Sequence, residues 1–202
     1  MIDKAVEDAR GGRIAFVSHC VLNQNAKVRG IAIHAAAIKP IVDLLIGEGV
    51  GIYQMPCPEM LYLGTTRWGQ VKDQYASPMF RRHLVGIASQ VADQAEEYAR
   101  GGYEVLAFIM IDGSPVCGLN KTPRPEEGRA WGGMHRYLPA SRLAPEPGVY
   151  CEILRAEVAR RGLGSVPFVG IPEVPDIGSI EAALPRIAAA LKGSRPRPPS
   201  SA

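Results

Sequence analysis

Three of the four cysteines in this 202-residue chain follow apolar runs that are typical of buried β-strands. Cys20 ends the run that begins at residue 13, Cys57 follows the run 50–56, and Cys117 follows the very apolar run 103–111. In a parallel sheet the carboxyl ends of the strands meet at one edge, where α/β proteins place their sites. Three thiols at one edge would be soft ligands for a metal or an iron–sulfur centre with one coordination position left open.

The elements that must position these thiols alternate along the chain. Apolar runs predict strands over 13–20, 50–56, 103–111 and 166–171, and helical periodicity predicts helices over 34–48, 78–100, 148–161 and 179–192. Pro40 should kink or delay the first helix, and Ser179 should be the N-cap of the last. This alternation predicts a single-domain α/β fold with a mostly parallel, doubly wound (Rossmann-like) sheet and the cysteines at the C-terminal edge of its strands.

The predicted domain spans residues 1–192, and the Pro/Ser-rich tail 193–202 is expected to be disordered. Two connections inside the domain, 58–77 and 118–147, are unusually long, and such loops are usually functional or disordered. Both leave the edge that carries the cysteines. The first contains Arg67 and Trp68 and the second contains His135, so together they are candidates for a lid over the cysteine site.

Composition limits which partners the protein is expected to bind and where in the cell it is expected to be. The chain is 47% hydrophobic and 21% charged, with a net charge of +3, and it has no long Lys/Arg run, so nucleic acid is not expected as a partner. The N-terminus lacks the apolar stretch of a secretory signal peptide, and no apolar run reaches the roughly 18 residues of a membrane helix. The expected location is therefore the cytoplasm, without membrane association. Cysteines in that reducing compartment are ligands or core residues more often than disulfides.

Three short motifs carry a family resemblance. The segments 17–22 (Val-Ser-His-Cys-Val-Leu), 57–59 (Cys-Pro-Glu) and 114–118 (Ser-Pro-Val-Cys-Gly) occur in this order, each after a predicted strand. They resemble the three signatures of the DUF523 / thiouracil desulfidase (TudS) family, and are most similar to the putative desulfidases related to it. The resemblance covers residues 13 to about 173. The chain departs from the main family over residues 23–30, a segment expected to shape the substrate pocket.

The resemblance implies a cofactor and an activity. In that family three cysteines hold a [4Fe-4S] cluster whose fourth iron has no protein ligand, a role that falls here to Cys20, Cys57 and Cys117. An open iron is a soft Lewis acid that can polarise a C=S bond for attack by water. The implied activity is removal of sulfur from a small thiocarbonyl substrate, such as a thiouracil-like nucleobase or nucleoside, by hydrolysis without net redox change and with release of hydrosulfide. Thiolated RNA is not excluded as a substrate. The chain is expected to be a monomer or a homodimer.

Two residues of these motifs are catalytic candidates. Glu59 is the first candidate for the base that activates water, against the alternative of a salt-bridge acid at a helix N-terminus. Ser114 could donate a hydrogen bond to the substrate or orient water, although Gly-Ser-Pro favours a turn by itself. Asp112 is either a second acid or a cap of the loop.

The remaining polar candidates have equally plausible structural roles. Asn23 could read a nucleobase edge, Arg67 and Trp68 could pair with or stack on a heterocycle, and His135 could reach the substrate; turn formation and surface packing are the alternatives. His19 should point away from Cys20, because side chains alternate along a strand. Cys151 lies in a predicted helix and should be a buried small hydrophobe rather than a fourth ligand.

Rival functions also follow from the same residues. A non-catalytic iron–sulfur or sulfide-binding protein, or a sulfur carrier, would use the same three thiols without turnover. A zinc protein or a nucleotide-binding domain is disfavoured, because the chain lacks Cys-x-x-Cys pairs and has no Gly-x-Gly-x-x-Gly or Walker A pattern after any strand. A thiol enzyme would need only one of the three cysteines.

Overall fold

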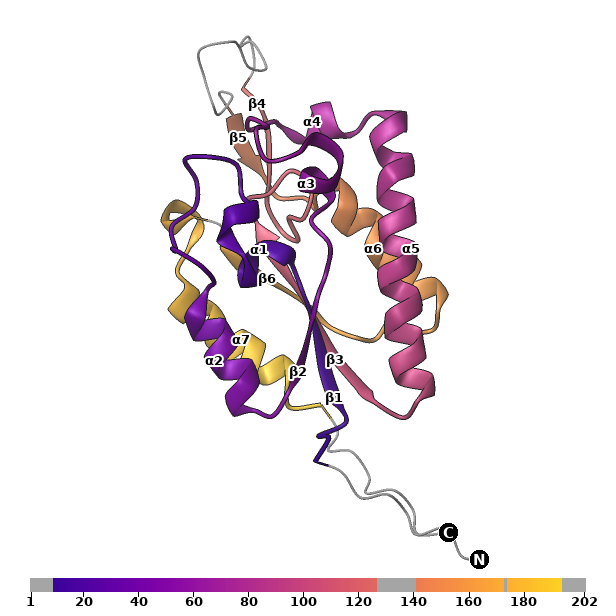
Figure 1. The fold of residues 1–202 in the computed structure, drawn as a ribbon. Coiled ribbons are helices and arrows are strands. Elements are labelled where there is room, and N and C mark those ends of the chain that lie inside the picture. Colours follow the sequence, from indigo (N-terminus) through magenta and orange to yellow (C-terminus); the bar gives the residue numbers. More distant parts are fainter. Residues whose placement is uncertain (1–8, 127–140, 173, 194–202) are drawn as a thin grey trace, which may run out of the picture.

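The computed structural model describes residues 9–126, 141–172 and 174–193 (Figure 1). Its strands are β1 (Arg13–Val17), β2 (Gly51–Gln54), β3 (Glu104–Asp112), β4 (Thr122–Pro125), β5 (Ser141–Ala144) and β6 (Phe168–Pro172). Its α-helices are α1 (His19–Leu22), α2 (Lys39–Gly47), α3 (Pro58–Leu63), α4 (Lys72–Tyr75), α5 (Pro78–Arg100), α6 (Val149–Arg160) and α7 (Ile180–Ala190). Two 3-10 turns, η1 (Gln24–Ala26) and η2 (Pro175–Ile177), complete the described elements.

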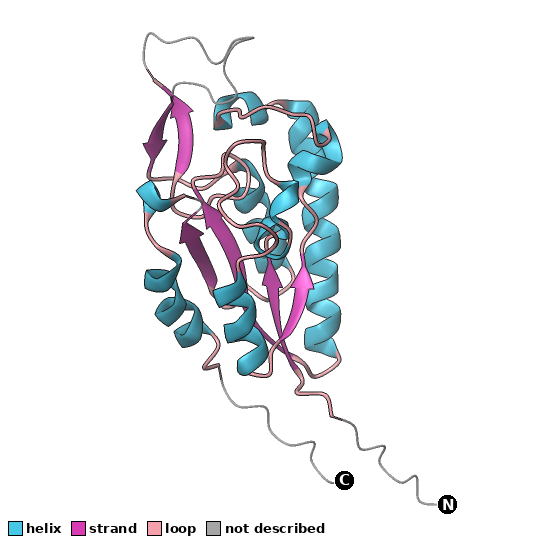
Figure 2. Cartoon of the chain, turned by 60° about the vertical axis from the view of Figure 1, so that its left-hand side comes forward, coloured by secondary structure: helices cyan, strands magenta, loops and turns pink. Residues whose placement is uncertain are grey.

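The main sheet has four parallel strands in the order β2-β1-β3-β6. Helices α2 and α7 cover one face, and α5 and α6 cover the other (Figure 1). The predicted α/β fold with a mostly parallel sheet is therefore confirmed. A separate antiparallel pair, β4 and β5, lies beyond the ends of these strands (Figure 2).

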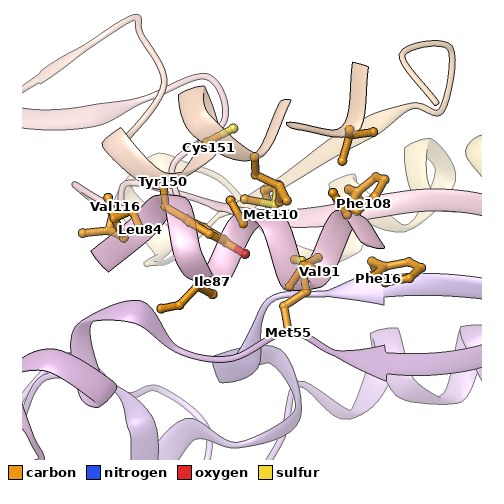
Figure 3. Close-up of a cluster of buried hydrophobic side chains, with 14 of the residues drawn as sticks. Phe16, Met55, Leu84, Ile87, Val91, Phe108, Met110, Val116, Tyr150 and Cys151 are labelled. Atoms are coloured by element: carbon orange, nitrogen blue, oxygen red, sulfur yellow. The ribbon is translucent and has the colours of Figure 1, made fainter. Parts of the chain in front are cut away.

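Alternating side chains on the central strands supply two hydrophobic cores. Phe16 and Phe108 point to the face that α5 and α6 cover, with their ring centroids 5.1 Å apart (Figure 3). Val17 and Ile109 point to the opposite face and pack with α2 and α7. Strands that are buried on both faces read as continuous apolar runs, which is why β1 and β3 could be recognised in the sequence.

The longest helix follows directly from its local sequence. The Ser77 hydroxyl accepts a hydrogen bond from the backbone N–H of Phe80 (3.3 Å), and Pro78 occupies the first turn of α5. The helix ends before Gly101 and Gly102, so the predicted range 78–100 is confirmed. Helix α2 begins only at Lys39, because Pro40 is tolerated in a first turn but not in a helix interior.

The local predictions for the end of the first strand and for the two long connections are wrong. The first strand ends at Val17, and Cys20 lies in the short helix α1, so the alternation argument for His19 does not apply. The connections 58–77 and 118–147, predicted as loops, contain α3 and α4 and the arms β4 and β5. These elements are too short for a periodic pattern to stand out, and they are stabilised by contacts from other segments. Within the described residues, no helix combines the length and the apolarity needed to cross a membrane.

A network of ion pairs attaches the β4–β5 pair to the helices. The buried Lys72 ammonium donates to Glu146 (3.2 Å) and to Glu152 on α6 (2.6 Å). Arg124 on β4 donates to the same Glu146 (2.5 Å) and to Asp73 on α4 (2.7 Å). Glu146 thus joins two cations from elements that are far apart in the sequence.

We expect the contribution of Glu146 to stability to disappear in acid. The hydrogen bond from Arg124 lowers the pKa of Glu146 from 4.5 to about 2, with Lys72 adding to the effect. A carboxylate with a depressed pKa stabilises the fold above its unfolded-state pKa, and this stabilisation is lost as the pH falls through the folded-state value. Arg124→Gln should therefore lower the free energy of unfolding at pH 7, and its deficit should shrink between pH 4.5 and 2.

Urea unfolding of both proteins across this pH range measures the deficit. Arg160→Gln is the matched control, because Arg160 is an exposed arginine that pairs only with its helix neighbour Glu157 among the described ion pairs. A deficit for Arg124→Gln that stays constant from pH 7 to pH 2 would contradict the assignment.

Candidate functional site

A pocket of about 510 Å³ lies at the carboxyl ends of the sheet strands. Its lining includes segments that follow β1, β2, β3 and β6. Six of the residues selected from the sequence line this one pocket: Cys20, Cys57, Glu59, Arg67, Ser114 and Cys117. Because β1 lies between β2 and β3 in the sheet, the segments that follow these strands are brought side by side (Figure 1). In doubly wound sheets this edge is where ligands bind.

Each cysteine has its own local support. Cys20 lies in the single helical turn α1, Cys57 is the N-cap of α3, and Cys117 lies in the turn after β3. None of the four cysteines of the chain forms a disulfide. Three thiols from separate strand ends thus line the same pocket, although they are far apart in the sequence.

The turn that carries Cys117 is held by side chains of its own. The Ser114 hydroxyl accepts hydrogen bonds from the backbone N–H groups of Val116 (3.3 Å) and Cys117 (3.0 Å). The Asp112 carboxylate accepts from the N–H groups of Leu119 and Asn120, so Asp112 closes the loop and does not line the pocket. A Cβ on Gly118 would lie 2.5 Å from the Ser114 carbonyl oxygen, which excludes larger residues there.

Cys57 and Cys117 lie in an environment that disfavours ionisation of their thiols. Burial raises the pKa of Cys57, as does the Glu59 carboxylate, while the backbone N–H groups of Met60 and Glu59 favour the thiolate. The pKa of Cys117 is raised well above its usual value, first by burial and then by Cys57 and Cys20 nearby. Like charges so close to one another cannot all form unless a positive group compensates for them. A metal centre would provide that positive charge.

Glu59 and Arg67 form a buried ion pair beside the thiols. The Arg67 Nε donates to Glu59 Oε2 at 3.1 Å, and the Arg67 side chain is only 4% exposed. Arg67 Nη1 also donates to the Gly64 carbonyl (3.0 Å), and Nη2 donates to the Ala26 carbonyl (2.5 Å). Tyr75 is buried next to this pair, and its pKa is raised by burial and by the Glu59 charge. The carboxylate is therefore held in one orientation at the pocket wall.

Other candidates lie elsewhere. The Asn23 side chain accepts a hydrogen bond from the Asn25 backbone N–H (3.1 Å) and does not line the pocket. Trp68 is 56% exposed and is also absent from the lining. His135 lies outside the described residues. Cys151 is fully buried in the core among residues of β3, α5 and α6, which confirms its predicted burial (Figure 3).

His19, the neighbour of Cys20, is half-buried. Its imidazole bonds to the Met55 backbone, and burial lowers its pKa, so the neutral ring is favoured. His19 is not among the residues that line the pocket. This contact joins the segment after β1 to the end of β2.

The pocket wall includes residues of three segments that the sequence analysis expected near the site, namely 23–30, 58–77 and 118–147. Apolar side chains line it from three distant segments: Val28 and Ile31 after α1, Leu143 on β5, and Ile177 in η2. Glu126 and Asp176 add carboxylates to the lining. Ile31, Asp176 and Ile177 lie outside the predicted segments, and the tertiary arrangement brings them to the cysteines. Apolar walls with a few convergent polar groups are typical of small-molecule sites.

The spacing of the candidate ligands bears on the kind of centre that they could hold. In the described parts of the chain, no three Cys, His, Asp or Glu side chains are grouped so that they could hold one metal ion. This result concerns a single ion. In a cubane cluster each thiolate binds a different iron atom, so the sulfurs are spread around a larger group.

Comparisons with known proteins place the chain beside an archaeal relative. No family model matches the chain, and no solved structure matches it significantly. The chain is 35% identical over 112 residues to the uncharacterized protein MJ0003 of Methanocaldococcus jannaschii. The alignment covers 55% of this chain and 71% of the relative. On this identity and coverage, the chain belongs to the same protein family as MJ0003.

Proposed function

We propose that this protein is a [4Fe-4S]-dependent desulfidase that removes sulfur from a thiocarbonyl substrate by hydrolysis. The observation that supports it most is the shared pocket, which Cys20, Cys57 and Cys117 line together with the carboxylate of Glu59. The resemblance of the three cysteine motifs to the thiouracil desulfidases suggests the reaction. It also suggests the substrate class, a thiouracil-like nucleobase or nucleoside.

The donor set fits such a cluster. Cys20, Cys57 and Cys117 would hold it, because three thiolates from three strand ends suit soft iron and leave one coordination position without a protein ligand. Cys151 is packed in the hydrophobic core and does not line the pocket, so it would not close that position. When bound, the cluster would supply a Lewis acid that polarises the C=S bond of the substrate.

The residues of the chain would supply the rest of the reaction. Glu59 would take a proton from the water that attacks the thiocarbonyl carbon, with its carboxylate oriented by Arg67. A C–O bond forms, the C–S bond breaks, and the sulfur leaves as hydrosulfide, so the oxygen of water replaces it without oxidation or reduction. Val28, Ile31 and Leu143 would contact the faces of a flat heterocycle and exclude bulk water.

Ser114 would act mainly through the turn that it stabilises. Its hydroxyl oxygen accepts two backbone N–H groups, which leaves its own proton available to a substrate or a water in the pocket. The site would work in the reducing cytoplasm, since a cluster with an open iron is sensitive to oxidation.

A non-catalytic sulfide-binding or sulfur-carrying protein is the second candidate. The observation that favours it is the Glu59–Arg67 ion pair, because a carboxylate oxygen that already accepts a hydrogen bond from a guanidinium is less available to a water molecule. Such a protein would bind the cluster and sulfide and would show no turnover.

Anaerobic reconstitution with iron and sulfide, followed by iron and sulfide analysis and a hydrosulfide assay on 2- and 4-thiouracil, tests both candidates. About four irons per chain with hydrosulfide release would support the desulfidase. The same iron content without release from any thiocarbonyl compound would favour the sulfur carrier. A chain with intact thiols that retains no iron would exclude both.

A further inference from the structure

Arg67 connects three backbone segments that border the candidate site. Its Nε reaches Glu59 on α3, its Nη1 reaches the carbonyl of Gly64 that follows α3, and its Nη2 reaches the carbonyl of Ala26 at the end of η1. All three guanidinium nitrogens therefore donate to acceptors of the protein. The side chain is 4% exposed, so these bonds form away from water.

The bond to Ala26 joins the two cysteine segments. Ala26 lies six residues after Cys20, and Glu59 lies two residues after Cys57. In the sequence, Arg67 is 41 residues from Ala26 but only 8 from Glu59. Ala26, Glu59 and Arg67 all line the same pocket. One guanidinium thus sets the spacing between the segment after β1 and the segment after β2.

The geometry suits arginine in particular. A guanidinium presents its donors in a rigid planar fork, so it can bind a carboxylate and two carbonyls in fixed directions. A lysine ammonium carries the same charge but cannot span three acceptors on different sides. Removal of the fork would leave Glu59 without its partner and the Ala26 carbonyl without its donor.

We propose that Arg67 is a positioning residue that orients Glu59 and joins the Cys20 segment to the Cys57 segment. Its effect on the substrate is indirect, through the placement of the carboxylate and the pocket wall. This inference rests on the proposed function for its kinetic consequence, but its structural consequence is present in the protein without a cluster.

The structural consequence is measured by amide hydrogen exchange of the full chain without cluster. Arg67→Ala and Arg67→Lys should each raise exchange roughly tenfold in peptides covering 24–31 and 58–64, and leave α7 unchanged. Arg160→Ala is the control, because it removes an exposed arginine from α6 and touches neither segment. Unchanged exchange in both segments would overturn the proposal. So would a uniform rise over the whole chain in the lysine variant, which would indicate general destabilisation.

The kinetic consequence is measured on the reconstituted protein with 2-thiouracil. Arg67→Ala should lower kcat about 10²-fold with KM unchanged, because the base is misplaced while the pocket stays open. Millimolar guanidinium should restore part of kcat, and urea at the same concentration should not, since it has the shape but not the charge. A variant with wild-type kcat, or one rescued equally by urea, would overturn the proposal.

The two readouts separate the possible failures. If the wild-type protein holds iron but shows no turnover, the desulfidase proposal is refuted. The exchange experiment then still tests the structural role of Arg67. If the wild-type protein shows turnover and the Arg67→Ala variant has unchanged exchange and unchanged kcat, the role proposed for Arg67 is refuted. The desulfidase proposal then stands.

Discussion

Replacement of Cys57 by Ala should reduce the iron content of the reconstituted protein from about four atoms per chain to near zero. Cys57 is the central case because it is the N-cap of α3 and lines the pocket beside Glu59. Cys20→Ala and Cys117→Ala should have the same effect. A cubane with only two protein thiolates would have two exposed irons and would be lost.

Cys151→Ala is the matched control for these three variants. Cys151 is the fourth cysteine of the chain, but it is fully buried in the hydrophobic core with Leu154 and Tyr150. It should keep its full iron content and lose only about 1 kcal/mol of stability from the small cavity. Iron analysis and the absorption spectrum of the four reconstituted variants measure the result. A Cys151→Ala protein that cannot hold iron, or a Cys57→Ala protein that can, would refute the ligand set.

Glu59→Gln should lower kcat for hydrosulfide release by about 10²–10⁴-fold and leave the iron content unchanged. The amide oxygen can still accept the hydrogen bond from Arg67 Nε, so the geometry of the pocket is largely kept. The amide cannot take a proton from water, so only the proposed chemical step is removed. A loss of stability of up to about 3 kcal/mol is expected, because the buried guanidinium loses its charged partner and keeps only the hydrogen bond.

Steady-state assays under anaerobic conditions, with iron content measured on the same samples, test this prediction. Asp43→Asn is the control, since Asp43 lies on the exposed face of α2 and pairs with Lys39, away from the pocket. A Glu59→Gln protein with full iron and wild-type kcat would assign the base to another group. Loss of iron together with activity would instead show that Glu59 supports the cluster.

Local sequence patterns were enough to predict the layered architecture and the three candidate ligands. Continuous apolar runs such as 103–111 predict strands buried on both faces, and the long amphipathic run 78–100 between a serine cap and two glycines predicts α5 to its ends. Parallel strands must end at one edge, so a cysteine after each of three strands already implied that the thiols lie near one another. These inferences need only local periodicity and the handedness of strand–helix–strand units.

The arrangement of side chains around the thiols depends on tertiary contacts that local patterns do not reveal. Arg67 and Trp68 are neighbours in the sequence, and both were equally good candidates for contact with a substrate. Arg67 is buried against Glu59 and Ala26, whereas Trp68 is exposed. Asn23 and Ser114 turned out to stabilise their own turns, and Leu143 and Ile177 reach the pocket from distant segments. Such contacts depend on the packing of short elements whose stability comes from their partners. A local sequence pattern contains no information about those partners. Periodicity therefore predicts the strands and the cysteines that follow them, but not the walls of the pocket.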